Sequence, residues 1–208
     1  MTEKTHENTP LPYHYIAIEG CIGAGKTELS KRLATEFNAP LVLEQFAENV
    51  FLPLFYKEPV HYAFHVEVTF LIDRYEQMST FFANLPARNT LVFADYFMEK
   101  CLIFARNNLT KDEYIVFEKI FKQFHAPLPK PDLLIYLHKD AEHLLRNIKQ
   151  RGRVYEQNIQ TEYLDNIQNQ YFKYLQSYHR CPIIKINSND LDFVNNPTDY
   201  EQVKTLII

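Results

Sequence analysis

Short apolar runs recur along the chain, separated by longer stretches in which apolar residues follow a helical period. Runs of this length, rich in Val, Ile and Leu with few polar interruptions, are typical of strands buried on both faces of a sheet. We therefore expect a five-stranded parallel sheet. Its strands are predicted at residues 14–19, 41–45, 91–95, 132–138 and 182–187.

The longest helical stretch lies between the second and third runs, at residues 60–85. Its apolar positions are three or four residues apart, which predicts one long amphipathic helix. These positions are Phe64, Val68, Leu71, Tyr75 and Met78. A second helix, at 110–125, opens with Thr110 and Glu113, which form a capping-box pattern.

Further helical patterns alternate with the apolar runs, at 27–37, 97–107, 141–151, 160–178 and 198–206. Strands that alternate with helices predict an α/β fold, in which helices cover both faces of a doubly wound sheet. The aromatic-rich helices at 60–125 bury more surface than one sheet face needs. We therefore also expect a homodimer that forms through helices.

Length and composition add limits to this picture. The chain has 208 residues, of which 46% are apolar, and this suits one domain, expected at 13–208, with a substantial core. The first twelve residues, 1–12, are polar and lack an apolar segment, so we expect them to be disordered. No stretch approaches 18 uninterrupted apolar residues, which argues against a membrane span and favours a cytoplasmic protein.

The charged residues argue for a small-molecule substrate rather than a nucleic acid. The net charge is −4 and no run of Lys or Arg marks a nucleic-acid footprint. The three cysteines are far apart and show no C-x-x-C spacing. They support neither a disulfide framework nor a zinc site.

Glycine is scarce except in one short segment. Average usage is about 7%, yet the chain has four glycines, and three of them lie in EGCIGAGKT at residues 19–27. Glycine is needed where the backbone has positive φ or where another group approaches more closely than a Cβ allows. The concentration of glycine therefore predicts a backbone cradle.

The cradle has the pattern G-x-x-x-x-G-K-[ST] between a predicted strand and a predicted helix, which is typical of a phosphate loop. Its amides would surround the phosphates of ATP, Lys26 would reach the β and γ oxygens, and Thr27 would hold Mg²⁺. The alternative is a tight turn that caps a helix. The loop residues are Gly20, Cys21, Ile22, Gly23, Ala24, Gly25, Lys26 and Thr27.

Cys21 has two interpretations. A thiol at a helix N-terminus can have a lowered pKa and be oxidisable. The simpler interpretation is a small side chain that fits the loop.

Two acids follow expected strands at the edge where ligands of α/β sheets gather. Glu44 ends the second run, and Asp95 ends the third after four apolar residues. Asp95 has the form of a Walker B carboxylate, which holds Mg²⁺ directly or through water. The alternative for each acid is a cap on the next helix.

A basic segment, Arg151-Gly152-Arg153, separates two predicted helices. Arginines on a mobile lid can neutralise a phosphoryl group in transfer and exclude water. Gly152 suits a hinge in such a helical lid. The alternative is a solvated basic loop. With the phosphate loop, these features predict a P-loop three-layer fold with a helical lid.

In this order and at these spacings, EGCIGAGKT, Glu44, FYKEPVHYAF, Asp95 and RGRVYEQ resemble the deoxynucleoside kinases. The likeness extends from about Tyr15 to the end of the chain. It implies transfer of the γ-phosphoryl group of a nucleoside triphosphate to the 5′-hydroxyl of a deoxynucleoside, on a fold that is usually dimeric.

The resemblance also implies residue roles. Glu44 matches the acid beside the 5′-hydroxyl, and Asp95 matches the acid of the (D/E)-R-S motif; either could act as the base. Tyr56 and Glu156 match the pair that binds the sugar 3′-hydroxyl. Arg151 and Arg153 match the lid arginines, and residues 189–193 match the loop that meets the base of the donor.

Two positions depart from the family pattern. The family usually has arginine after the acid of the third strand, and here Tyr96 stands in its place. Either another arginine substitutes, or Tyr96 fills the space as a neutral donor.

The second departure is Glu67, where relatives commonly have a glutamine that pairs with the base. An ionised carboxylate offers acceptors only, which suits the two adjacent N–H donors of guanine. We therefore expect a purine preference that leans to deoxyguanosine or deoxyadenosine, unless Glu67 is merely an ion-pair partner of Arg74, two turns later.

Two other functions share part of this pattern. A nucleoside monophosphate kinase, such as thymidylate kinase, would need arginine where Tyr96 stands. A nucleotide-dependent switch specific for guanine would carry an N-K-x-D stretch, and the sequence has none. An assay of ATP with each nucleoside and each monophosphate distinguishes these two functions from a deoxynucleoside kinase.

Overall fold

The computed structural model describes residues 11–45, 49–85 and 90–207. The first ten residues of the segment expected to be disordered lie outside this part of the chain. A five-stranded sheet forms the centre, in the order β2-β3-β1-β4-β5, and all its pairings are parallel. The predicted α/β fold with five parallel strands is therefore confirmed. The strands are β1 (Tyr15–Gly20), β2 (Leu41–Val42), β3 (Val92–Ala94), β4 (Leu133–His138) and β5 (Ile183–Asn187).

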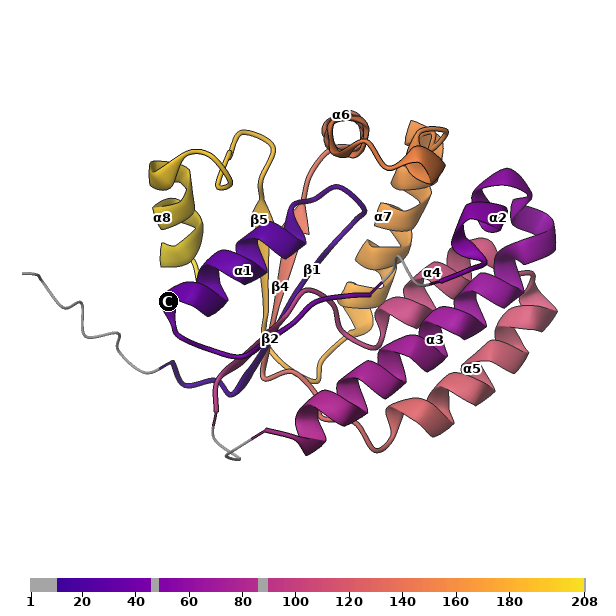
Figure 1. Cartoon of the computed structure of the whole chain (residues 1–208), viewed down its shortest axis with the longest axis horizontal. Coiled ribbons are helices and arrows are strands. Elements are labelled where there is room, and N and C mark those ends of the chain that lie inside the picture. Colours follow the sequence, from indigo (N-terminus) through magenta and orange to yellow (C-terminus); the bar gives the residue numbers. More distant parts are fainter. Residues whose placement is uncertain (1–10, 46–48, 86–89, 208) are drawn as a thin grey trace, which may run out of the picture.

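Helices cover both faces of this sheet (Figure 1). α1 and α8 lie on one side, α4 and α7 on the other, and α3 and α5 form an outer layer beyond α4. The helices are α1 (Lys26–Glu36), α2 (Leu52–Lys57), α3 (Pro59–Ala83), α4 (Lys100–Asn108), α5 (Lys111–His125), α6 (Ala141–Arg151), α7 (Thr161–Ser177) and α8 (Pro197–Thr205), with a 3-10 turn η2 (Val154–Glu156) after α6.

The central strands are apolar along their whole length because both faces are covered. Ile16, Ala17 and Ile18 of β1 are fully buried, as are Leu133 to Leu137 of β4. The carboxyl ends of the strands therefore provide the polar edge at which a site can form.

The edge strand β2 is shorter than the sequence predicts. It pairs with β3 only at Leu41 and Val42. Beyond this point the backbone N–H of Glu44 donates to the side chain of Asp95, at 2.7 Å, instead of to a neighbouring strand. The predicted strand at 41–45 thus ends early because a side chain replaces the ladder.

Helix starts agree with the sequence where a local signal exists. The capping box of α5 is confirmed, since Thr110 Oγ1 accepts the N–H of Glu113 and the Glu113 side chain accepts the N–H of Thr110. α4 begins at Lys100, later than the predicted position 97, because the N–H of Phe97 donates to the buried side chain of Glu19.

Helix α2 is missing from the sequence prediction. Its six residues include Pro53 near the start, and Pro59 opens α3 immediately after it. The prolines separate two helices that form one aromatic-rich sequence stretch, and proline in a first helical turn is well tolerated. Within the described residues, no helix is long and apolar enough to cross a membrane.

Candidate active site

The predicted phosphate loop lies between β1 and α1, and its glycines are required by their surroundings. Gly23 has φ 85°, and a Cβ there would lie 2.7 Å from the carbonyl oxygen of Leu144. Gly25 has φ 93°, and a Cβ there would lie 2.8 Å from the ring of Phe193. The loop is thus held in a conformation that side chains would disrupt, and it leads directly into the N-terminus of α1.

Lys26 folds over this loop. Its ammonium group donates to the carbonyl oxygens of Gly20 at 2.9 Å and Cys21 at 3.0 Å. Burial, followed by the nearby charge of Lys100, lowers the pKa of Lys26. Bound phosphate oxygens would offer this ammonium group stronger, charged acceptors.

The Cys21 side chain packs in the core. Burial raises the pKa of its thiol to about 12, and the thiol lies 3.8 Å from the carbonyl oxygen of Leu164. The structure favours the interpretation of Cys21 as a small packing residue over that of a reactive thiol.

Asp95 joins the phosphate loop to the second strand. Its Oδ2 accepts the hydroxyl of Thr27 at 2.6 Å, and its Oδ1 accepts the backbone N–H of Glu44. A hydroxyl and a carboxylate beside a phosphate loop are the hard oxygen ligands that Mg²⁺ prefers, and Mg²⁺ usually takes its other ligands from water and substrate phosphates. The pair Thr27 and Asp95 therefore fits a magnesium ion.

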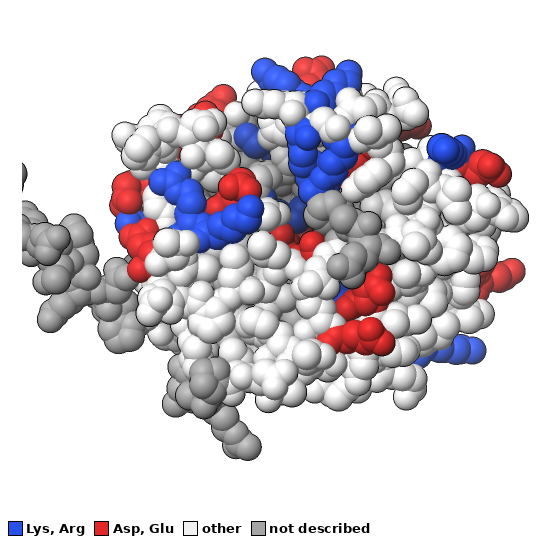
Figure 2. Space-filling view, in the orientation of Figure 1, with Lys and Arg blue, Asp and Glu red and all other residues white. Residues whose placement is uncertain are grey.

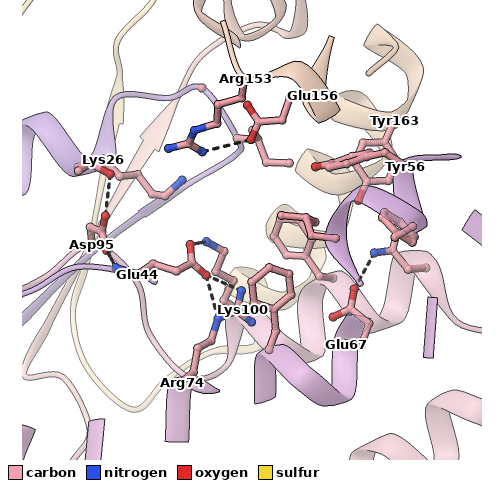
Figure 3. Close-up of a pocket in the computed structure, with 18 of the residues that line it drawn as sticks. Lys26, Glu44, Tyr56, Glu67, Arg74, Asp95, Lys100, Arg153, Glu156 and Tyr163 are labelled. Carbon is pink, nitrogen blue, oxygen red and sulfur yellow. Dashed lines mark hydrogen bonds and ion pairs between the residues drawn. The ribbon is translucent and has the colours of Figure 1, made fainter. Parts of the chain in front are cut away.

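Glu44 is bonded by two cations. Arg74 donates to Oε1 through Nε at 2.9 Å and through Nη2 at 2.5 Å, and Lys100 donates to Oε2 at 2.6 Å. Burial raises the pKa of Glu44, but Lys100 and Arg74 more than offset this and hold the pKa well below its usual range. Glu44 is therefore a fixed carboxylate, and Figure 3 shows it across the cavity from Lys26.

Tyr96 does not take part in this cluster. Its hydroxyl donates to Gln77 at 2.6 Å, and Gln77 in turn donates to the carbonyl oxygen of Leu43. The side chain is fully buried and does not line the described cavity. Of the two interpretations left open by the sequence, the geometry agrees with another arginine, because Arg74 bonds Glu44, where Lys100 joins it.

A buried carboxylate that sequence reasoning missed supports the loop from below. Glu19 is fully buried and accepts three hydrogen bonds: from the N–H groups of Gly20 and Phe97 and from the hydroxyl of Tyr171. Burial raises its pKa, against the opposing charge of Lys100. Glu19 thus ties the start of the phosphate loop to β3 and α7.

The lid arginines meet Glu156. Arg151 Nη2 lies 2.5 Å from one oxygen of Glu156, and Arg153 Nη1 lies 3.2 Å from the other. Glu156 itself is 4% exposed, and the ring of Tyr56 stacks on that of Tyr155 in the same turn. The structure therefore brings the four predicted residues of the lid and sugar side together.

Gly152 has a local structural function. It is the C-cap of α6, with φ 75°, and its N–H reaches the carbonyl oxygens of Ile148 and Lys149. A Cβ at this position would meet nothing within 4 Å. A left-handed glycine that ends a helix explains the residue without a hinge.

Glu67 lies at the other end of the cavity. Asn108 donates to its Oε1 at 2.7 Å, while its Oε2 is buried without a hydrogen-bond partner among the described residues. Burial raises the pKa of Glu67 to about 7. Glu67 is therefore not held as an ion-pair partner by Arg74, which donates its side-chain hydrogen bonds to Glu44 and Cys101.

Most of the predicted site residues line one cavity of about 770 Å³, its open mouth included. Lys and Arg side chains gather around a hollow in this face of the molecule (Figure 2), although the whole chain has a net charge of −4. The predicted residues that line the cavity are Ile22, Gly23, Lys26, Thr27, Glu44, Tyr56, Glu67, Arg74, Asp95, Arg151, Arg153 and Glu156.

Five predicted site residues do not line this cavity: Gly20, Cys21, Ala24, Gly25 and Tyr96. Sequence reasoning missed several that line it, chiefly Lys100, Asn108 and Tyr163, with Leu52, Phe55, Phe70 and Phe104 as the apolar part. One signal for Lys100 was available. A lysine at the start of a helix opposes the helix dipole, and such a position needs a separate explanation.

Residues 189–193 lie beside the phosphate loop. The Asn189 side chain accepts the N–H of Asp140 at 2.8 Å, and the Phe193 ring packs at Gly25. The Phe193 carbonyl accepts from Arg32 of α1. This segment is therefore fixed next to the place where a donor nucleotide would lie.

Comparison with known proteins gives a consistent result. Residues 16–207 match the family model described as deoxynucleoside kinase. The chain is 34% identical to a deoxyguanosine kinase of Bacillus subtilis, over 93% of this chain and 98% of that protein. It is 32% identical to a deoxyadenosine kinase of Dictyostelium discoideum, over 93% of this chain and 77% of that protein.

Solved structures share the fold. A deoxyadenosine kinase from M. mycoides, with the products dCMP and a flexible dCDP bound, superimposes with a TM-score of 0.79 at 24% identity. The match covers 93% of this chain and 98% of the other. The same enzyme with bound dATP gives the same TM-score.

Proposed function

Since this chain belongs to the deoxynucleoside kinase family and is thus a phosphotransferase, we propose that it transfers the γ-phosphoryl group of ATP to the 5′-hydroxyl of a purine deoxynucleoside, preferably deoxyguanosine. One observation carries the proposal. The phosphate loop, two strand-end acids and a buried glutamate with an unpaired oxygen line the same cavity. This arrangement offers a place for the triphosphate, the hydroxyl and the base of two substrates.

On the donor side, the loop amides and Lys26 bind the phosphates of ATP. Thr27 and Asp95 would hold Mg²⁺, which neutralises charge on the β and γ oxygens when it is bound. Arg151 and Arg153 exchange Glu156 for phosphate oxygens as the donor enters. The basic rim of the cavity supports this assignment.

On the acceptor side, Glu44 accepts a hydrogen bond from the 5′-hydroxyl and orients its oxygen toward the γ-phosphorus. Two cations hold Glu44 ionised, which makes it a weak base and a good positioning group. A loose transition state has little need for early proton removal. Positioning and charge therefore contribute more than basicity, and Asp95 contributes through Thr27 and the backbone of Glu44.

The sugar lies between Glu44 and the η2 turn. Tyr56 and Glu156 bind the 3′-hydroxyl, and both line the cavity on its lid side. Glu156 would then exchange its bonds with Arg151 and Arg153 for one to the sugar. When the nucleoside binds Glu156, the lid arginines Arg151 and Arg153 are thus released to bind the phosphates.

The base meets Glu67. Guanine presents N1–H and a 2-amino group side by side, and an ionised Glu67 offers acceptors only. Asn108 occupies one lone pair of Oε1 and leaves Oε2 unpaired. Guanine would donate a hydrogen bond to this buried oxygen. A buried oxygen without a hydrogen bond is unfavourable by about 1–3 kcal/mol.

The test is a coupled assay with ATP and each of the four deoxynucleosides and their monophosphates. We expect the highest kcat/KM for deoxyguanosine, and we expect Glu67→Gln to shift the preference toward deoxyadenosine. Equal or better use of deoxycytidine or thymidine contradicts the base assignment. Phosphorylation of monophosphates alone would favour the monophosphate kinase alternative, and slow hydrolysis without transfer would favour a switch.

Lys26→Ala provides the matching loss of function. We expect kcat to fall about 100-fold or more, as for removal of one donor to a transition-state oxygen. Lys31→Ala is the control, because Lys31 lies on the same helix and pairs with Glu28 at the surface. If Lys26→Ala retains full activity, the phosphate assignment is wrong.

We also propose that the chain forms a homodimer through α3 and α5. Ile72 of α3 and Ile115 and Val116 of α5 are exposed apolar residues, and the two helices lie together in the outer layer, away from the sheet (Figure 1). The cytoplasmic location stays a prediction from the sequence.

A further inference from the structure

Lys100 occupies an unfavourable position for a lysine. It is the first residue of α4, where the helix dipole disfavours a cation. It is also only 5% exposed, so its charge is largely removed from water. A lysine in such a place requires compensation by something in the site.

Glu44 supplies only part of this compensation. A lysine ammonium group has three donors, and within the described residues Lys100 makes one hydrogen bond, to Oε2 of Glu44 at 2.6 Å. Arg74 already bonds the other oxygen of Glu44 twice. Glu44 is thus the one hydrogen-bond acceptor of this ammonium group among the described residues, and the ammonium group also lies 5.6 Å from the centroid of the Phe104 ring. Lys100 therefore keeps further N–H donors at the cavity wall.

Lys100 also lies where the two halves of the proposed reaction meet. Its charge acts on Lys26, which faces the phosphates, and on Glu44, which faces the hydroxyl, since it lowers the pKa of both. Lys26 acts on Glu44 in the same way. Lys100 lines the same cavity as Lys26 and Glu44 and bonds Glu44 directly.

We propose that Lys100 is a catalytic residue that binds the phosphoryl group in transfer, with the N–H donors that Glu44 leaves unused. The inference rests on the proposed function. In the step, the bond from the γ-phosphorus to the β,γ-bridging oxygen breaks, a bond from the 5′-oxygen to the γ-phosphorus forms, and the hydroxyl proton leaves to Glu44 or water. Lys100 neither gains nor loses a proton; it neutralises charge on the equatorial oxygens.

The first measurement compares Lys100→Met with Arg106→Met. Arg106 lies on the same helix and stacks on Tyr114, outside the cavity. For Lys100→Met we expect kcat to fall about 100-fold, with the KM of each substrate changed less than about threefold, and for Arg106→Met we expect little change. An unchanged kcat in Lys100→Met overturns the inference and leaves the proposed function intact.

A double variant separates direct contact from action through Glu44. If Lys100 only holds Glu44, then Lys100→Met has no further effect in a Glu44→Gln background. If it binds the phosphoryl group, we expect kcat to fall at least tenfold in that background too. Additivity of this kind supports the inference, and its absence reduces Lys100 to a positioning residue.

A binding measurement removes the dependence on turnover. Isothermal titration compares affinity for ADP alone with affinity for ADP, deoxyguanosine, magnesium and aluminium fluoride, which mimics the phosphoryl group in transfer. We expect Lys100→Met to weaken binding of the aluminium fluoride complex at least tenfold more than binding of ADP alone. Equal weakening of the two contradicts the inference. A wild-type chain that phosphorylates no deoxynucleoside overturns the proposed function and this inference with it.

Discussion

Glu44, which is half-buried, and Glu67, which is buried, are glutamates of the same cavity, and their surroundings move their pKa values in opposite directions. Glu44 has Arg74 and Lys100 at hydrogen-bond distance, and its pKa lies below the usual range. Glu67 has the neutral amide of Asn108 as its hydrogen-bond partner, and burial raises the pKa of Glu67 to about 7. The same residue type thus provides a permanent anion where we propose that the 5′-hydroxyl binds and a titratable group where we propose that the base binds.

Titration of Glu67 predicts a base preference that depends on pH. Ionised Glu67 suits the two donors of guanine, whereas protonated Glu67 offers one donor and one acceptor, which suits adenine. We expect the ratio of kcat/KM for deoxyguanosine to that for deoxyadenosine to rise up to about 100-fold between pH 6 and 8, because the ionised fraction of a group with a pKa of about 7 rises about tenfold while its protonated fraction falls about tenfold. ATP and magnesium effects cancel in this ratio.

Glu67→Gln is the control for this titration. In this variant the ratio of the two kcat/KM values should not vary with pH. If the ratio still rises with pH, a group other than Glu67 causes the change. Stability gives an independent check. Because the folded pKa is raised, the folded state binds more protons than the unfolded state between pH 4.5 and about 7, so stability falls as pH rises through this window. Glu67→Gln should therefore gain up to about 3 kcal/mol over wild type above pH 7.

At the residue scale the sequence placed Glu67, Glu44 and Arg74 in the site but missed the partners Asn108 and Lys100. Asn108 is 41 positions from Glu67, and Lys100 is 56 positions from Glu44. Neither partner belongs to a local motif. Packing of α4 against α3 brings Asn108 to Glu67, and the position of α4 beside the end of β2 brings Lys100 to Glu44. The same limit explains Tyr96, whose direction toward Gln77 depends on α3.

At the scale of elements, α6 and the turn that follows it show how a cap can resemble a hinge in sequence. Gly152 is in the left-handed region with open space around it. We expect Gly152→Ala to lose about 1–2 kcal/mol, because a Cβ is unfavourable at this φ. Asn tolerates the conformation, so Gly152→Asn should keep stability and kcat near wild type.

Thermal unfolding and steady-state kinetics of the two variants decide between cap and hinge. A cap predicts a loss that is confined to stability and is largely absent in Gly152→Asn. If both variants lower kcat by a similar factor while their melting temperatures stay unchanged, the hinge interpretation is correct instead.

Strands and long helices were predictable because their signals are local. Apolar runs gave all five strands, and Thr110 with Glu113 gave the start of α5. The errors have tertiary causes: Asp95 ends β2 early, and Glu19 delays the start of α4. Helix α2 is only one and a half turns long and follows from its packing on α3, which a periodic pattern does not reveal.

At the scale of the whole molecule, the outer layer of α3 and α5 is the surface that we propose for self-association. We expect light scattering to give twice the 24.7 kDa mass of one chain, since the exposed apolar residues Ile72, Ile115 and Val116 would be buried between copies. The double change Ile115→Glu and Val116→Glu should give the mass of one chain, because it would bury charge at the interface.

Val194→Glu is the control for this experiment. Val194 is also exposed, but it precedes α8, which lies on the opposite side of the sheet from α3 and α5. A wild-type mass of one chain at micromolar concentration contradicts the dimer. A loss of dimer in the control as well would place the interface elsewhere.

Glu19 binds groups that are far apart in the chain, and this affects how the protein is made. The phosphate loop leaves the ribosome early. Tyr171, which donates to Glu19 at 2.8 Å, lies 152 positions after Glu19 and leaves the ribosome much later. A nascent chain that ends before Tyr171 contains the whole phosphate loop but lacks the hydroxyl that binds Glu19, at the start of this loop. Competence to bind nucleotide should therefore arise late in translation, when α7 has emerged.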